Sequence, residues 1–416
     1  MEHTRLGINA RGEPVSLTLH ERLRQIAVLG KTGMGKSTLL RSIVGQDIAR
    51  GDGVLLIDPH GQLAEDVLVL VPPERRNQVC FFDLSDAEYP VAFNLFADVH
   101  PDDRELLAEG IVSAMFTIWG NSWGPQLERI LRNSLIVLLD SPGTSFLHIP
   151  RFLTDPEFRA RVVKRAKNPV ARAFFEGQFA SWPQDFIETS ISPVLNKVEA
   201  FAVNQKIRNV LGQERSKLHF EHALRHGRIV IAKLAKGAVG DKPAFLMGSL
   251  LLARAQAAIM ARERDPNDRR PFHIVIDEAQ NFGPGVITTL LTDARKFAAS
   301  VTVATQFLDR LETEARQAVL GSTETLVCFR LGPDDAEQLA PLFNREHQTF
   351  NPHVLHNLKL GEAWCRGSYL YPELHPPTYP NAESARQQSR RHYARPRRVV
   401  EVEVERIFMH TKRKRK

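Results

Sequence analysis

Four residues near the start of the chain fit the pattern G-x-x-x-x-G-K-[ST]: Gly30, Gly35, Lys36 and Ser37. Glycines let a backbone bend so that several N–H groups point into one concavity, and the helix that follows adds the positive end of its dipole. We expect the Lys36 ammonium to contact the β and γ phosphates of a nucleotide, and the Ser37 hydroxyl to ligate Mg²⁺. The pattern therefore predicts ATP and Mg²⁺ as ligands.

The same loop lies between an apolar run, Ile26–Leu29, and a helical pattern that starts at Leu39. A chance match is the alternative interpretation, and this strand-loop-helix placement argues against it. We assign seven residues of the loop to nucleotide binding: Gly30, Thr32, Gly33, Gly35, Lys36, Ser37 and Thr38.

A second apolar run, FHIVI, ends in two acids, Asp277 and Glu278. Hydrolysis of a magnesium-bound triphosphate requires such acids at the end of a strand next to the phosphate loop. Asp277 is expected to hold the metal, directly or through water, and Glu278 to polarise the attacking water as a general base. Ordinary capping of a following helix is the competing interpretation.

A third apolar run, Ser300–Ala304, is followed by Thr305 and Gln306. If this strand runs parallel to the others, its polar end meets the same edge of the sheet. Gln306 is then placed to sense the γ phosphate or to orient water, and we assign it to the catalytic group. The alternative is a turn residue whose side chain satisfies backbone groups.

Two arginines are candidates for the charge that stabilises a transferring phosphoryl group. Arg295 lies outside the apolar face of the predicted helix Val286–Ala299, so it should be exposed, and Arg330 directly follows the predicted strand Thr325–Phe329. Either could enter the nucleotide site of a neighbouring subunit as an arginine finger. A solvated surface charge is the plainer interpretation.

Strand and helix patterns alternate around these motifs, which predicts an α/β fold with a mainly parallel central sheet flanked by helices. From about residue 102 to 205 the pattern is helical only, and Gln126–Asp140 carries an apolar stripe at helical spacing. We interpret 102–205 as an inserted all-α domain. Long helical crossovers without a core of their own are the alternative.

Composition narrows the class of protein further. The chain has 416 residues, 43% hydrophobic and 25% charged, which is typical of a globular protein. It has neither a run of 18 apolar residues nor a signal-peptide pattern, so we expect a cytoplasmic protein. Its three cysteines, Cys80, Cys328 and Cys365, are far apart, which argues against a zinc site or a disulfide framework.

The formal charge of +7 is concentrated at the C-terminus. Ser384–Lys416 holds 12 Lys or Arg and 3 Glu, which leaves 43 basic and 45 acidic residues in 1–383. Within this segment, Val399–Glu405 alternates Val and Glu and predicts a half-buried strand. The basic end, Lys412–Lys416, suits a nucleic-acid arm or a disordered solubilising end equally well.

Contacts to nucleic acid are harder to place within the body of the chain. Lys233, Lys236 and Lys242 lie in and beside a predicted polar loop, Gly237–Lys242, that follows a strand. They could form a pore loop that binds phosphates, although scattered surface lysines are the alternative. His60 is interpreted as a turn residue, because no second His or Cys stands at metal-ligand spacing.

The order and spacing of GKTGMGKS, VLLIDPHG, IDEAQNF and ATQ resemble the HerA/FtsK superfamily of DNA-pumping ATPases, and most of all the cytosolic motor of type IV secretion coupling proteins of conjugation. The resemblance covers about residues 5–375. It implies a RecA-like P-loop fold, with Lys36 and Ser37 as the Walker A pair, Asp277 and Glu278 as the Walker B pair and Gln306 as the sensor. Arg295 matches the place of the family's arginine finger. A hexameric ring with DNA in its channel is also implied.

The sequence departs from that family in two respects. The N-terminal transmembrane helices of coupling proteins are missing, and only about two dozen residues precede the phosphate loop, where HerA proteins carry a barrel domain. We therefore expect a first ATPase part at 1–101, the inserted helical domain at 102–205, a second ATPase part at 206–378 and a basic tail at 379–416.

The expected function is ATP-driven DNA translocation with hydrolysis at subunit interfaces of a ring. One alternative is an ATPase subunit that powers or scaffolds a protein assembly, such as a secretion or defence complex, with partners bound through the helical domain. Another is a nucleotide switch that hydrolyses slowly.

Overall fold

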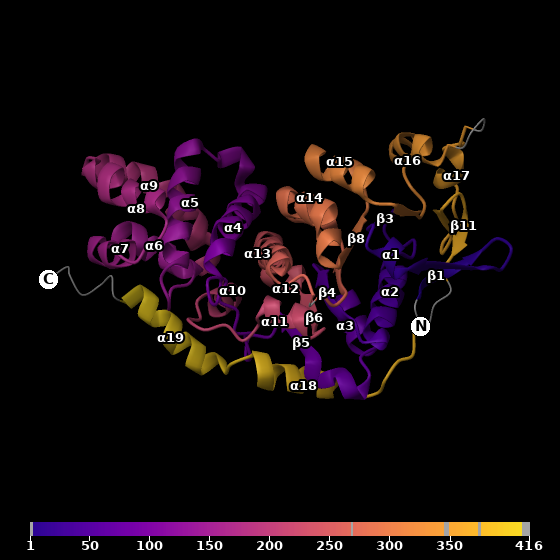
Figure 1. Cartoon of the computed structure of the whole chain (residues 1–416), viewed down its shortest axis with the longest axis horizontal. Coiled ribbons are helices and arrows are strands. Elements are labelled where there is room, and N and C mark those ends of the chain that lie inside the picture. Colours follow the sequence, from indigo (N-terminus) through magenta and orange to yellow (C-terminus); the bar gives the residue numbers. More distant parts are fainter. Residues whose placement is uncertain (1–2, 268, 345–348, 373–375, 410–416) are drawn as a thin grey trace. The chain divides into compact units, whose positions relative to one another are not determined.

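The computed structural model describes residues 3–267, 269–344, 349–372 and 376–409 (Figure 1). The chain divides into two compact units. The first, here called the sheet unit, comprises Met1–Phe81, Glu221–Lys233 and Ile259–Gln388, and the second, the helical unit, comprises Phe82–Phe220, Leu234–Ala258 and Ser389–Lys416.

The sheet unit is built on a mixed sheet with, in the described part of the chain, eleven strands in the order β2-β1-β11-β10-β9-β3-β8-β7-β4-β6-β5. The strands are β1 (His3–Asn9), β2 (Pro14–Thr18), β3 (Ile26–Leu29), β4 (Gly53–Asp58), β5 (Val79–Asp83), β6 (Ile229–Lys233), β7 (Phe272–Ile276), β8 (Ala299–Thr305), β9 (Thr325–Cys328), β10 (Ala363–Cys365) and β11 (Ser368–Tyr371). The predicted α/β fold with a mainly parallel central sheet is confirmed.

The middle of the sheet is parallel, and this fixes where the polar strand ends lie. β3 pairs with β8 and β9, β7 pairs with β8 and β4, and β4 pairs with β6, all in parallel. Leu29 is opposite Thr305, and Ile57 is opposite Ile276. Because parallel strands end at the same edge, the residues that follow β3, β4, β7 and β8 meet there.

One side of the sheet is extended by antiparallel strands. β10 pairs with β9 and β11, and β1 pairs with β11 and β2. Neither β1 nor β11 was predicted from the sequence. Their pairing joins Asn9 to Leu370, residues at nearly opposite ends of the chain, and a local pattern does not reveal such a partner.

Helices surround the strands in the sheet unit. They are α1 (Leu19–Arg22), α2 (Lys36–Arg50), α3 (Gln62–Leu68), α14 (Pro284–Asp293), α15 (Thr313–Ser322), α16 (Pro333–Leu339) and α17 (His353–His356). Apolar residues of α2 and α3 form a buried cluster with those of the central strands. Four further elements contain a division point between the units: β5, α11 (Phe220–Arg225), α13 (Asp241–Met260) and α18 (Ala382–Tyr393).

A buried charged network lies at the amino-terminal edge of the central strands. Arg22 is only 1% exposed; it donates to Thr302 on β8 and to Asp47 on α2, both at 2.9 Å. Burial lowers the pKa of Arg22, although Asp47 opposes this shift. Asp52 contacts the imidazole of His273 at 3.3 Å and so ties the end of α2 to β7. These contacts hold the far end of the helix that begins at the phosphate loop.

In the helical unit, every described element between residues 102 and 205 is helical. The helices of the unit include α4 (Arg104–Trp119), α5 (Pro125–Leu139), α6 (Ile149–Thr154), α7 (Pro156–Val163), α8 (Pro169–Ala173), α9 (Gln184–Ala202), α10 (Gln205–Leu211), α12 (Lys236–Val239) and α19 (Arg397–Met409). The apolar stripe predicted on Gln126–Asp140 is buried along α5, as a helix packed on one face requires.

The strand predicted at Val399–Glu405 is wrong, because this stretch lies within α19. Val400, Val404 and Ile407 are buried at helical spacing, and Arg397 pairs with Glu401 one turn later at 2.8 Å. Over a few residues, an alternation of Val and Glu fits the period of a strand as well as that of a helix. Packing of the buried face therefore decides which of the two forms. The basic residues Lys412–Lys416 lie outside the described residues.

One helical stretch of the described chain, Asp241–Arg264, is long and apolar enough to cross a membrane by length and composition. Of its most apolar window, 83% is buried inside the protein. A core helix passes the same test of length and composition.

His148 makes the stability of the helical unit sensitive to acid. The ring, 7% exposed, accepts a hydrogen bond from the Ser145 N–H at 3.0 Å. Burial and then Arg151 lower its pKa to about 4. The folded state therefore favours the neutral ring, and this contribution is lost as pH falls from about 6.5 towards 4, reaching ~2 kcal/mol at pH 5.

Between pH 7 and pH 5, we expect the free energy of unfolding to fall by ~2 kcal/mol more in the wild-type protein than in His148→Gln. In this variant the amide oxygen can still accept a hydrogen bond. Urea unfolding of both proteins at the two pH values measures the difference. Equal pH dependence in the two proteins would show that His148 contributes nothing to the loss of stability in acid.

Candidate nucleotide-binding and hydrolysis site

The loop between β3 and α2 has the shape that the glycine pattern predicts. Gly30, Gly33 and Gly35 have φ angles of +153°, +76° and +114°. A Cβ on Gly30 would lie 2.6 Å from the Cβ of Phe329, so a larger residue cannot fit there. α2 begins at Lys36, and among the described residues no side chain caps its N-terminus. The N-terminal N–H groups of α2 are thus those that an anion can bind.

Lys36 extends over the loop from which it arises. Its side chain is buried, 6% exposed, and Nζ donates to the carbonyl oxygens of Gly30 at 2.6 Å and Lys31 at 3.2 Å. Burial lowers the pKa of Lys36, while Glu278 and Asp277 act in the opposite direction. The two acids therefore influence the loop lysine electrostatically, as expected for one shared site.

Asp277 and Glu278 follow β7 and are almost fully buried, 6% and 7% exposed. The Asp277 N–H donates to the carbonyl of Ile57 on β4 at 3.0 Å. Burial first, and then the charges of Glu278 and Asp58, raise the pKa of Asp277 to about 7 against the opposing effect of Lys36. This corner thus concentrates more negative charge than Lys36 offsets. A cation would relieve that excess.

Asp58 is a site residue that was not predicted from the sequence. It ends β4 as Asp277 follows β7, and it is fully buried. Its two carboxylate oxygens accept from the backbone N–H groups of His60 and Ala64, both at 2.9 Å, so it holds the turn that leads into α3. The signal was present, because VLLID ends in an acid just as FHIVID does.

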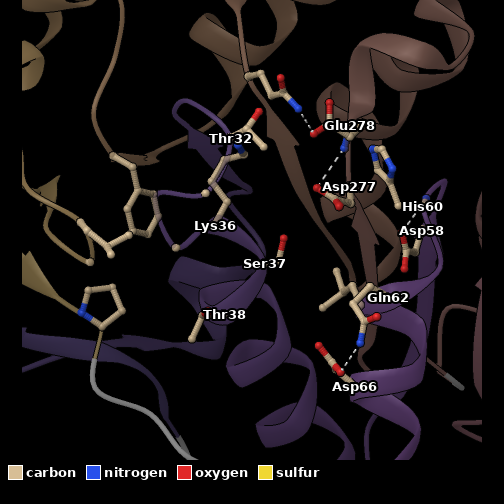
Figure 2. A pocket seen from close by; sticks show the side chains of 18 residues that line it. Thr32, Lys36, Ser37, Thr38, Asp58, His60, Gln62, Asp66, Asp277 and Glu278 are labelled. Atoms are coloured by element: carbon tan, nitrogen blue, oxygen red, sulfur yellow. Dashed lines mark hydrogen bonds between the residues drawn. The ribbon is translucent and has the colours of Figure 1, made fainter.

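The loop and the acids line one cavity of about 760 Å³ (Figure 2). This volume falls within the range of ligand sites. The predicted site residues that line it are Thr32, Gly33, Gly35, Lys36, Ser37, Thr38, Asp277, Glu278 and Gln306. Ser37 and Asp277 face each other across it (Figure 2). The cavity is also lined by residues without charged side chains: Phe329, Leu360, Gly361 and Pro372.

Glu278 and Gln306 are brought into direct contact. Glu278 has a φ angle of +52°, a left-handed conformation that is uncommon for residues with a side chain. One of its carboxylate oxygens accepts a hydrogen bond from the Gln306 amide at 2.5 Å. Strained backbone of this kind is typical of functional sites. The predicted convergence of strand ends thus holds for the acid and for the glutamine.

The two candidate arginines lie outside the cavity. Arg295 is exposed in a 3₁₀ turn, Ala294–Phe297, rather than in the predicted helix, because α14 ends at Asp293. This turn precedes β8, so Arg295 lies at the opposite end of that strand from Gln306. Arg330 is exposed beside the loop, with Nη2 3.2 Å from the sulfur of Met34. Neither arginine is among the residues that line the cavity.

The lysines considered for a pore loop are not on a loop. Lys233 ends β6, and its Nζ pairs with Glu65 at 2.7 Å. Lys236 begins α12, with Nζ 5.8 Å from the ring centre of Phe245, and Lys242 lies in the first turn of α13. The predicted polar loop is therefore wrong, because only two residues separate β6 from α12, and α13 follows α12.

Three comparisons with known proteins agree with this architecture. Residues 5–90 match the family described as helicase HerA, central domain. The plasmid coupling protein TrwB, solved in complex with ADP and Mg²⁺, is similar with a TM-score of 0.65 and 15% identity, over 91% of this chain and 92% of that chain. VirB4 of Thermoanaerobacter pseudethanolicus is similar with a TM-score of 0.54 and 17% identity, over 91% of this chain and 97% of that chain.

A shorter match joins the chain to the thiamine import ATP-binding protein ThiQ of Salmonella typhimurium, 33% identical over 149 residues. These cover 31% of this chain and 60% of that protein, so the chain spans less than two thirds of this relative's length. The likenesses to solved structures show the fold. Together with the HerA match, they confirm the predicted resemblance to HerA/FtsK-type P-loop ATPases of conjugation and secretion.

Proposed function

We propose that this protein is a cytoplasmic, Mg²⁺-dependent ATPase whose hydrolysis drives the movement of DNA. One observation carries the ATPase proposal: Lys36, Asp277 and Glu278 line one cavity although they come from distant parts of the chain. ADP with Mg²⁺ in TrwB supports the same ligands here.

In this proposal, different groups of the chain bind the phosphates and the metal ion. The loop N–H groups and Lys36 bind and orient the phosphates. Hydroxyl and carboxylate oxygens are the donors that Mg²⁺ prefers, so Ser37 and Asp277 would hold the ion, and the raised pKa of Asp277 fits a carboxyl that gains a cation. When bound, Mg²⁺ neutralises charge on the β and γ phosphates.

Glu278 is the proposed general base, and Gln306 the group that orients the attacking water. Both line the cavity, and both lie at ends of neighbouring parallel strands. Glu278 would accept the proton of the water that attacks the γ phosphorus. The water-derived oxygen then stays on the released phosphate, and ADP leaves.

The proposal that a ring of this protein translocates DNA is supported by the similarity to the coupling-protein fold and by the HerA match. In a hexameric ring, Arg295 would serve the nucleotide of the neighbouring subunit, which agrees with its exposure away from the cavity of its own subunit. Lys236, Lys242 and the basic end Lys412–Lys416 are the proposed contacts to DNA phosphates. Fold similarity to VirB4 favours the second candidate, an ATPase that powers a protein assembly.

Turnover of ATP in the presence of DNA separates these candidates. We expect added DNA to raise the ATPase rate several-fold, and this stimulation to weaken as salt rises because phosphate contacts are salt-dependent. Removal of 412–416 combined with Lys236→Gln and Lys242→Gln should reduce the stimulation and leave the basal rate unchanged. A rate that ignores DNA at every salt concentration would refute the translocase and favour the assembly ATPase.

A further inference from the structure

Both carboxylate oxygens of Glu278 are engaged by side-chain amides. Oε1 accepts from Nε2 of Gln306 at 2.5 Å, and Oε2 accepts from Nε2 of Gln280. Gln280 lies only two residues further along the chain, in the 3₁₀ turn Ala279–Asn281. The acid assigned to water activation is therefore held between two amides, one from its own turn and one from the neighbouring strand.

The orientation of the Gln280 amide is determined by Thr305. The buried Thr305 hydroxyl lies 2.8 Å from Oε1 of Gln280, and its other acceptor, the carbonyl of Phe307, is more distant at 3.2 Å. An oxygen that accepts from this hydroxyl leaves Nε2 of the amide directed to Glu278. A continuous chain of hydrogen bonds thus runs from β8 through Gln280 to the acid.

The two amides differ in their access to a ligand. Gln306 lines the cavity, whereas Gln280 is absent from the residues that line it. A γ phosphate in the cavity can therefore compete for the Gln306 amide, whereas the Gln280 amide lies outside the cavity lining. Binding of nucleotide alone would free one oxygen of Glu278 and leave the other held.

A hydrogen bond to a carboxylate competes with a water proton for the same oxygen. A hydrogen bond to a charged group is strong enough to slow proton acceptance by about an order of magnitude. Resting on the proposed ATPase function, we propose that Gln280 is a positioning residue that restrains Glu278 before activation. Full activity then requires the turn Ala279–Asn281 to shift and release Oε2.

The test replaces Gln280 with Met, which keeps the length of the side chain and removes the amide. We expect Gln280→Met to raise the kcat of DNA-free ATP turnover about five-fold or more, with KM for ATP and the Kd for a fluorescent ATP analogue within two-fold of wild type. A residue with a merely structural role would lower kcat or shift KM. An unchanged or reduced kcat overturns the restraint.

Two further variants make the result specific. Thr305→Val removes the hydroxyl that orients Gln280. It should also raise kcat, but by less than Gln280→Met does. If Gln280→Met fails to fold, Thr305→Val provides the test in its place. The double variant Glu278→Gln, Gln280→Met should be as inactive as Glu278→Gln alone, because the effect acts through Glu278. If wild type hydrolyses ATP and neither variant exceeds it, only the restraint fails; if wild type neither binds nor hydrolyses ATP, the proposed function fails with it.

Discussion

Replacement of Glu278 with Gln is expected to lower ATP turnover by a factor of ~10² to 10⁴ while nucleotide still binds. The amide retains the volume of the carboxylate and can still contact the amides of Gln306 and Gln280, but it cannot accept a proton from water. Phosphate release at saturating ATP measures the loss. Titration with a fluorescent ATP analogue should give a Kd within about three-fold of wild type.

Glu65→Gln is the matched control for this prediction. Glu65 lies on α3, pairs with Lys233 and Arg386 and is not among the residues that line the cavity. Its replacement should leave turnover within about two-fold of wild type, because the Glu65 side chain does not line the cavity. If Glu278→Gln retained most of the wild-type rate, the protein would be better described as a slow nucleotide switch.

Replacement of Lys36 with Ala should remove nucleotide binding itself. The ammonium is buried against the loop carbonyls, and its contacts to phosphate oxygens would be charge-assisted, so their loss is expected to weaken affinity by ~100-fold or more. The same titration with a fluorescent ATP analogue measures it. Turnover should be lost together with binding, in contrast to Glu278→Gln.

Lys31→Ala serves as the control for Lys36→Ala, because Lys31 belongs to the same loop but does not line the cavity. Its Kd should stay within about three-fold of wild type. Thermal unfolding of both variants tests whether they fold. An unchanged Kd for a folded Lys36→Ala protein would place the nucleotide elsewhere.

The site could be predicted from sequence because its signals are local. The glycine pattern requires a particular loop, and an apolar run that ends in acids marks a strand end. The rule that parallel strands end at one edge then brings Lys36, Asp277 and Gln306 together without knowledge of the strand order. The same rule, applied to VLLID, would also have identified Asp58.

Other features depend on contacts that no local pattern records. β1 and β11 pair although they are separated by most of the chain, and the Val-Glu alternation near the C-terminus took its helical form from packing of Val400, Val404 and Ile407. The amide of Gln280 that contacts Glu278 also accepts a hydrogen bond from the Thr305 hydroxyl, which lies on another strand. Such networks follow from register, which only the folded chain defines.

A structure of the protein with a non-hydrolysable ATP analogue and Mg²⁺ is the most direct test of the proposed nucleotide site. We predict that the γ phosphate lies against Lys36 and Gln306, with the ion held by the Ser37 hydroxyl and the Asp277 carboxylate, directly or through water. Nucleotide bound away from the loop, or an ion with no ligand from Ser37 or Asp277 even through water, would contradict it.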